Sequence, residues 1–317
     1  MPFVKSTYSR PWYMVHPHLE TVYPNRFRPA PRPSYVRKRL ELEDGDFMDL
    51  DWLRSGSNKR LALLAHGLEG DSNRPYMRGM ASAFFRQGWD VLAWNCRSCS
   101  GEMNRNFCLY HHGVSHDLEA VIEAVGDGYD EISLTGFSMG GAIVLKYLGE
   151  KGEQVPPNIK TATAISTPCH LPDSVRATQA KGNGIYVYFF LKQLGEKVIQ
   201  KAMQFPERLD PSALKHIKTL WEFADIYTAP MYGFENGEAF FEGVNAFPHL
   251  SNIRVPTLIL NAANDPMLEG NCYPENLAAR HDFIHLESPD TGGHVGFLKG
   301  TGMTYSELRA VAWASQG

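Results

Sequence analysis

The residues best suited to chemistry lie in one short run, Gly136-Phe137-Ser138-Met139-Gly140, which has the pattern G-x-S-x-G. An apolar stretch leads directly into this run and another leaves it, as a strand and a helix would. This context favours a sharp strand-to-helix turn that presents the Ser138 hydroxyl as a nucleophile. The amide of Met139, at the start of the helix, would then donate a hydrogen bond to an oxyanion. A tight turn without catalysis is the alternative interpretation of the two glycines.

A serine hydroxyl reacts well only beside a general base, and the chain offers candidates further along. His294 lies in a glycine-rich loop after the last apolar run, and Asp265 ends an earlier apolar run. The order serine, acid, histidine is the one that accompanies this kind of turn. We therefore predict that His294 takes the proton of Ser138 and that Asp265 orients the imidazole. Asp290 is the rival acid, although its place on the histidine loop makes it a poor rigid support.

A second oxyanion donor is expected from the loop after the first buried strand, where residues 66–70 read HGLEG. We predict that the backbone amide of Leu68 is this donor, the alternative being a plain glycine-rich turn. Together these groups would cleave an acyl ester through an acyl-serine intermediate. The predicted activity is therefore that of a serine carboxylesterase acting on a small-molecule ester, with an apolar acyl chain.

The elements that must position these groups alternate between strands and helices, which predicts a mostly parallel sheet with helices on both faces. Short apolar runs predict strands at 61–65, 89–94, 131–135, 161–166, 257–261 and 283–286. Helical spacing or composition predicts helices at 75–87, 115–125 and 140–148. Before them, alternating residues at 38–43 and 47–54 predict an antiparallel β-hairpin that turns at Asp44-Gly45.

The alternation breaks after residue 167, where helical patterns continue to about residue 250 without a convincing strand. We interpret 168–250 as a helical cap inserted over the carboxyl ends of the strands. The core would then comprise 59–167 and 251–317, with 1–58 forming an N-terminal arm and hairpin that belong to the core. Residues 1–37 show no clean period, so we expect an irregular arm there.

Composition limits the partners and the location. The chain has 317 residues, 43% of them hydrophobic, a formal net charge of −4, and no long basic block, so we expect no nucleic-acid partner. It has no apolar stretch of about 18 residues, so we expect no membrane span, and its first residues lack a secretory signal. Five scattered cysteines fit a reducing compartment, and we expect a cytoplasmic protein. Their spacing with nearby histidines is poor for zinc, and we expect no metal.

The chain also resembles the YheT-like branch of the α/β hydrolases, a group of esterases that includes ABHD-type relatives. The matching runs, in the order of that family, are HLET at 18–21, HGLEGDSNRPY at 66–76, NCRSCSGEMNR at 95–105, GFSMGG at 136–141, NDP at 264–266 and GGHVGF at 292–297. The resemblance implies an α/β-hydrolase fold, a triad of Ser138, Asp265 and His294, esterase-type activity, and no metal or organic cofactor. Ser98 departs from the family, which more usually has glycine there.

Two other functions fit the same residues. One is acyl transfer to an alcohol acceptor on the same triad, and the other is a non-catalytic binding protein on a hydrolase scaffold. The complete set of serine, acid and histidine in the right order argues against the second. Aromatic residues of the predicted cap at 186–191 either line an acyl pocket or pack the cap onto the core, and the sequence leaves both open.

Overall fold

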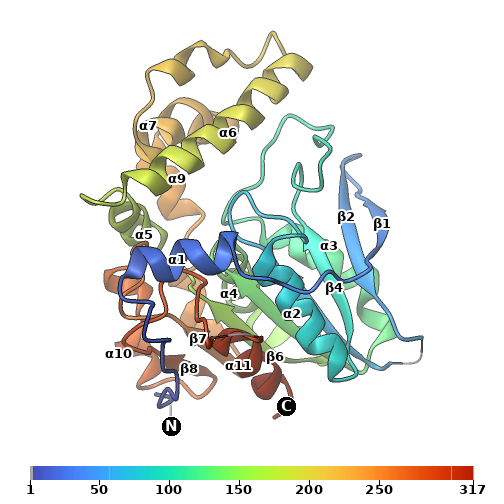
Figure 1. The fold of residues 1–317 in the computed structure, drawn as a ribbon. Helices are drawn as coiled ribbons and strands as arrows, with labels where there is room; N and C mark the ends of the chain where they lie inside the picture. The colour runs from blue at the N-terminus through green and yellow to red at the C-terminus, as the bar shows by residue number, and fades with distance from the viewer. Residues whose placement is uncertain (1–2, 57, 301, 317) are drawn as a thin grey trace.

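A computed structural model describes residues 3–56, 58–300 and 302–316 of the chain (Figure 1). Its centre is one eight-stranded sheet with the order β1-β2-β4-β3-β5-β6-β7-β8. The first two strands form the antiparallel hairpin, β2 pairs antiparallel with β4, and the other pairs are parallel. The strands are β1 Val36–Glu41, β2 Phe47–Leu53, β3 Arg60–Ala65, β4 Asp90–Asn95, β5 Glu131–Phe137, β6 Ile159–Ile165, β7 Thr257–Leu260 and β8 Ile284–Glu287.

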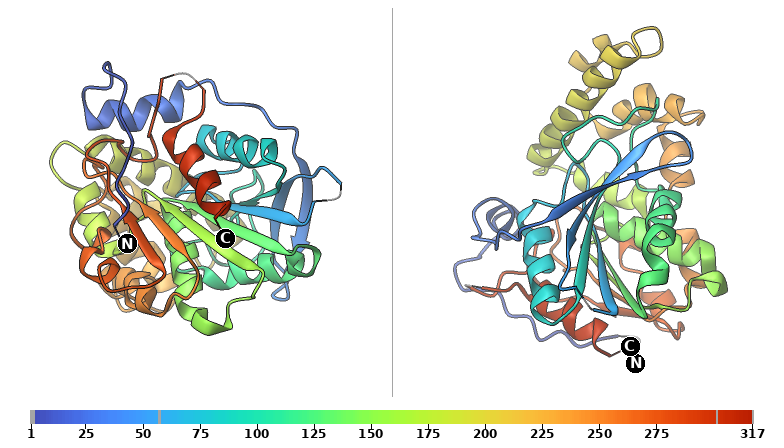
Figure 2. Two further views of the ribbon diagram at one scale, coloured as in Figure 1. Left: turned by 90° about the horizontal axis from the view of Figure 1, so that it is seen from below. Right: turned by 90° about the vertical axis from the view of Figure 1, so that its right-hand side faces the viewer.

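Helices cover both faces of this sheet, as the views in Figure 2 show. In β3, alternate side chains supply two different cores, since Leu61 and Leu63 point to one face while Ala62 and Leu64 point to the other. Every one of these side chains is fully buried, which explains the continuous apolar run in the sequence. One face is covered by α2 Pro75–Arg86 and α11 Tyr305–Ala314, and the other by α3 Ser115–Val125, α4 Met139–Lys151 and α10 Glu275–Ala278.

Only helical elements lie between β6 and β7, and most of them rise above the core in Figure 1. The α-helices are α5 Leu171–Thr178, α6 Gly184–Gln204, α7 Leu220–Phe223, α8 Ala229–Met231 and α9 Gly237–Gly243. Shorter turns are η3 Pro211–Lys215, the π-helical η4 Ala224–Thr228 and η5 Phe247–Asn252; elsewhere η1 Gly126–Gly128, η2 Gly152–Gln154 and η6 Gly270–Cys272 complete the set. No helix of the described residues is long and apolar enough to cross a membrane.

The N-terminal segment corrects one expectation, because residues 1–37 are not irregular throughout. They contain the helix α1 Pro17–Arg26, which crosses the molecule just below α6 (Figure 1). This helix buries Glu20 and Thr21 while the apolar Val22 is exposed. A hydrophobic period could not reveal it, because its inner face is polar and much of its outer face is apolar.

Candidate active site

Ser138 sits on a strained turn between β5 and α4. Its backbone has φ of 52° and ψ of −120°, a conformation that side chains rarely adopt. The glycines on either side are required by space. A Cβ at Gly136 would lie 2.3 Å from the Gly140 carbonyl oxygen, and a Cβ at Gly140 would lie 2.3 Å from that of Ala65. The predicted strand-to-helix turn is therefore present, with the serine at its tip.

The structure brings Ser138, His294 and Asp265 into one chain of hydrogen bonds. The Nδ1 atom of His294 lies 2.8 Å from Oδ2 and 3.1 Å from Oδ1 of Asp265, and its Nε2 atom lies 3.0 Å from the Ser138 Oγ. Because a carboxylate only accepts, Nδ1 carries the proton and Nε2 is free to accept the serine hydroxyl. The Asp265 side chain is fully buried, whereas the rival acid Asp290 is exposed.

Asp265 and the neighbouring strand ends are held in place by further buried contacts. The amide of Met267 donates to Asp265 Oδ1 at 2.9 Å, which fixes the carboxylate. Asn261, at the end of β7, accepts from the Thr167 amide at 2.7 Å and donates to the Thr167 carbonyl at 2.9 Å. These contacts tie the loop after β7 to the loop after β6, so the acid projects from a rigid edge of the sheet.

The loop with the predicted oxyanion donor Leu68 passes directly over Ser138. A Cβ at Gly67 would lie 3.2 Å from the Cβ of Ser138. His66 supports this loop from below, since its Nε2 accepts from the Cys96 amide at 3.1 Å and its Nδ1 donates to the Gly67 carbonyl at 2.8 Å. Burial lowers the pKa of His66 to about 4, so it stays neutral at physiological pH. Met139, whose amide is the other predicted donor, is the first residue of α4.

Ser98, the residue that departs from the family pattern, still adopts the backbone conformation of a glycine. Its φ is 64°, in the left-handed region. Its hydroxyl donates to Asn104 Oδ1 at 2.6 Å and accepts from the Asn104 amide at 3.2 Å. These local bonds help to hold the serine in that conformation, because short polar side chains tolerate this region when they bond nearby backbone.

The cysteines and histidines after β4 do not form a metal site. Cys99 Sγ instead accepts from Lys197 Nζ of α6 at 3.1 Å. The ring of His111 packs against Tyr232 with centroids 4.4 Å apart, and burial lowers the pKa of His111 to about 3. Within the part of the chain that the structure describes, no group of three or more His, Cys, Asp or Glu side chains could hold a metal ion.

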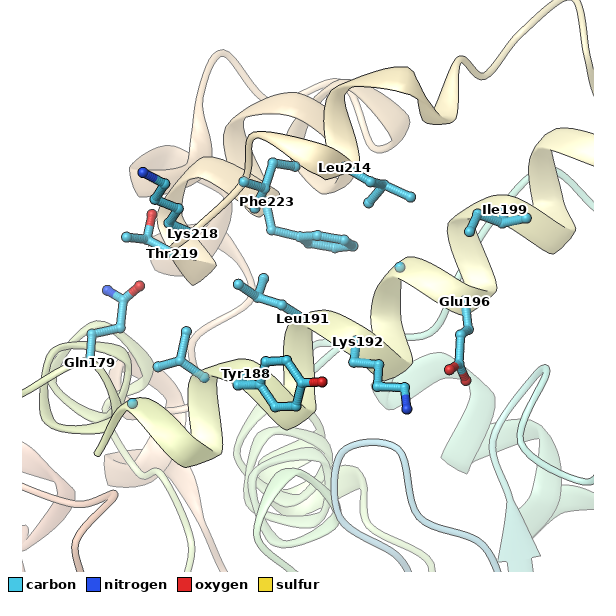
Figure 3. A pocket seen from close by; sticks show the side chains of 14 residues that line it. Gln179, Tyr188, Leu191, Lys192, Glu196, Ile199, Leu214, Lys218, Thr219 and Phe223 are labelled. Carbon is cyan, nitrogen blue, oxygen red and sulfur yellow. The ribbon is translucent and has the colours of Figure 1, made fainter. Parts of the chain in front are cut away.

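A largely apolar cavity of about 700 Å³ lies within the inserted helices, between α6 and the segment from η3 to α7 (Figure 3). Tyr188 and Leu191 are among its lining residues, but Ser138 and His294 are not. Tyr186 has another role, since its hydroxyl lies 2.8 Å from Nδ1 of His18 in α1. Among the aromatic residues at 186–191, Tyr188 therefore lines this cavity and Tyr186 contacts the N-terminal helix, and whether the cavity holds an acyl chain stays a prediction.

The polar inner face of α1, for which the sequence indicates no role, contacts the loop that carries His294 (the histidine loop). The Thr21 hydroxyl accepts from the His294 amide at 2.9 Å, and the Glu20 carboxylate accepts from the Gly292 amide at 2.6 Å. Both residues belong to the HLET run that carries part of the family resemblance. The HLET run could therefore have indicated that these residues matter, although nothing in its spacing indicates which loop they contact.

Comparisons with known proteins show the family and the fold of the chain. Residues 63–301 match the family model described as the alpha/beta hydrolase fold. YheT of Escherichia coli (strain K12) is 30% identical over 293 residues, which cover 90% of this chain and 85% of YheT. Phospholipase ABHD3 of Mus musculus is 25% identical, covering 94% of this chain and 75% of that protein. The Pyrococcus furiosus esterase Pf2001 has a similar fold, with a TM-score of 0.58 at 14% identity over 91% of this chain and 98% of its own. The chain therefore belongs to the α/β-hydrolase family, in its YheT/ABHD-type branch.

Proposed function

We propose that this protein hydrolyses carboxylic esters through an acyl-serine intermediate, with Ser138 as nucleophile, His294 as general base and Asp265 as the orienting acid. The observation that carries the proposal is the unbroken line from the serine hydroxyl through the imidazole to a buried carboxylate, with contacts of 3.0 Å and 2.8 Å. This arrangement is the one that activates a serine hydroxyl at neutral pH.

In the first half-reaction, Ser138 Oγ attacks the ester carbonyl carbon while its proton passes to Nε2 of His294. Negative charge develops on the carbonyl oxygen, where the amides of Leu68 and Met139 would stabilise it. The imidazolium then gives its proton to the departing alcohol, leaving the acyl group on the serine. The carboxylate of Asp265 stabilises the imidazolium without itself taking a proton.

In the second half-reaction, His294 takes a proton from water, which attacks the acyl-serine and releases the carboxylic acid. An ester with an apolar acyl chain is the substrate class that we favour. One observation supports it: the relative ABHD3 is named a phospholipase.

The test compares the wild type with Ser138→Ala on a short p-nitrophenyl ester. We expect turnover to fall by at least about a thousandfold, since the remaining groups cannot supply a nucleophile. Ser212→Ala is the matched control, because Ser212 is an exposed serine of the inserted helices. A fluorophosphonate should label the wild type at Ser138 and leave the Ser138→Ala protein unlabelled. Wild-type turnover by the Ser138→Ala variant would contradict the proposal.

A further inference from the structure

The inner face of α1 meets both loops on which the proposed mechanism depends. We propose that α1 is a positioning element for the general base, and that Glu20 and Thr21 are its positioning residues. This inference rests on the proposed function, because it assigns a purpose to contacts that converge on His294 and Asp265. Neither residue touches the reacting atoms, so each would act through the loops that it holds.

Thr21 and its helix neighbour Asn25 hold the peptide groups on both sides of His294. The Thr21 hydroxyl accepts from the His294 amide at 2.9 Å and donates to the Pro17 carbonyl at 2.8 Å, which fixes its direction. The Asn25 side-chain amide donates to the His294 carbonyl at 3.3 Å and to the Thr21 carbonyl at 2.7 Å. Because both polar backbone groups of residue 294 are bonded to α1, the helix sets the position from which the imidazole projects.

Glu20 links the histidine loop to the loop of the acid. Its carboxylate is almost fully buried and accepts from the Gly292 amide at 2.6 Å. Its two oxygens also accept from Asn264 Nδ2 at 3.2 and 3.3 Å, while Asn264 Oδ1 accepts from the Gly293 amide at 3.1 Å. Arg10 balances the buried charge at 2.9 Å. Asn264 immediately precedes Asp265 in the sequence. The Glu20 carboxylate therefore binds both the loop of the proposed acid, Asp265, and the loop of the proposed base, His294.

The histidine loop needs this support because its backbone is strained. Gly293, Val295 and Phe297 have φ of 59°, 58° and 46°. For the two residues with side chains, this region is unfavourable and persists only where the surroundings enforce it. The loop also packs against the backbone of α1, since a Cβ at Gly296 would lie 2.1 Å from the Glu20 carbonyl oxygen. Weaker contacts with α1 would let the loop relax and move the imidazole away from Ser138.

The test uses Thr21→Val, which keeps the shape and removes the hydroxyl, and Thr21→Ser, which restores it. Turnover of a short p-nitrophenyl ester is divided by the number of sites that a fluorophosphonate labels at completion. We expect Thr21→Val to lower kcat per site by about 10- to 100-fold, because a small misplacement of a catalytic group has effects of this size. KM should stay within about twofold, and Thr21→Ser should recover most of the rate. Val22→Ala, on the exposed side of α1, is the matched control and should match the wild type.

A purely structural role for α1 predicts a different result. It would lower the melting temperature and the number of labelled sites, but kcat per labelled site would match the wild type, and that result would overturn the inference. If Thr21→Val does not fold, Glu20→Gln provides a second variant for the same measurement, and we expect its kcat per labelled site to fall as well. Failure of the proposed function is distinguishable, because an active Ser138→Ala protein would reject the triad whatever the α1 variants do.

Discussion

His66 should make the stability of this protein depend on pH in a defined window. The residue is fully buried, and both ring nitrogens are used, Nδ1 as a donor to Gly67 and Nε2 as an acceptor from Cys96. A second proton could bind only by breaking the bond from Cys96. Burial accordingly lowers the pKa of His66 from 6.5 to about 4 in the folded state. The unfolded chain binds this proton near pH 6.5, so stability falls as the pH is lowered from there towards 4.

The size of the effect follows from that window. Each pH unit between the two pKa values costs about 1.4 kcal/mol, so the loss at pH 5 is about 2 kcal/mol relative to neutral pH. The measurement is the free energy of unfolding in urea at pH 7.5, 6.5, 5.5 and 5.0, for the wild type and for His66→Asn, which does not titrate. The difference between the two proteins should change by about 2 kcal/mol over this range. His216→Asn replaces an exposed histidine and serves as the control. A pH-independent difference between wild type and His66→Asn would refute the reasoning.

Three further changes test other parts of the site. Asp265→Asn should lower kcat by about 10³- to 10⁴-fold with little change in KM, measured by ester hydrolysis, because the amide favours the wrong imidazole tautomer. Gly140→Ala should abolish fluorophosphonate labelling, since its Cβ would meet the Ala65 carbonyl oxygen at 2.3 Å, and labelling at wild-type rate would count against the strained turn. Lys201→Met should lower the free energy of unfolding by about 2–4 kcal/mol, measured in urea. The buried ammonium of Lys201 bonds both the carbonyl and the side-chain oxygen of Asn104 at 2.8 Å, and an unchanged stability would contradict that role.

The sheet could be predicted because its strands leave a direct trace in the sequence. A strand buried on both faces is mostly apolar, and apolar runs accordingly cover residues 61–65 of β3 and 258–260 of β7. The candidate residues could be predicted because each follows such a run, at the carboxyl edge of a parallel sheet. Asp265 and Asp290 differ in their surroundings, since Asp265 lies in the loop after β7 with a buried side chain that contacts His294, whereas Asp290 is exposed on the loop that carries His294.

Other features leave no such trace. The helix α1 turns Glu20 and Thr21 inwards and Val22 outwards, which is the reverse of the pattern that periodicity detects. The positive φ of Ser98 could not be predicted either, because it is stabilised by a hydrogen bond to Asn104 across a loop. Contacts of this kind are set by tertiary structure, and one sequence does not encode which distant polar group will meet which loop.

Three residues at or beside the candidate site have a strained backbone, and contacts from distant segments hold two of them. Ser138 is strained itself, Glu69 with φ of 55° follows the predicted donor Leu68, and Val295 with φ of 58° follows His294. The Glu69 amide is held by the Tyr110 hydroxyl at 2.6 Å, and the Val295 amide by the Ser166 hydroxyl at 2.8 Å. Strain of about 1–3 kcal/mol at each point persists only while such contacts remain. Mutations at these supports should therefore act on catalysis before they unfold the chain, because the loops can relax while the sheet stays intact.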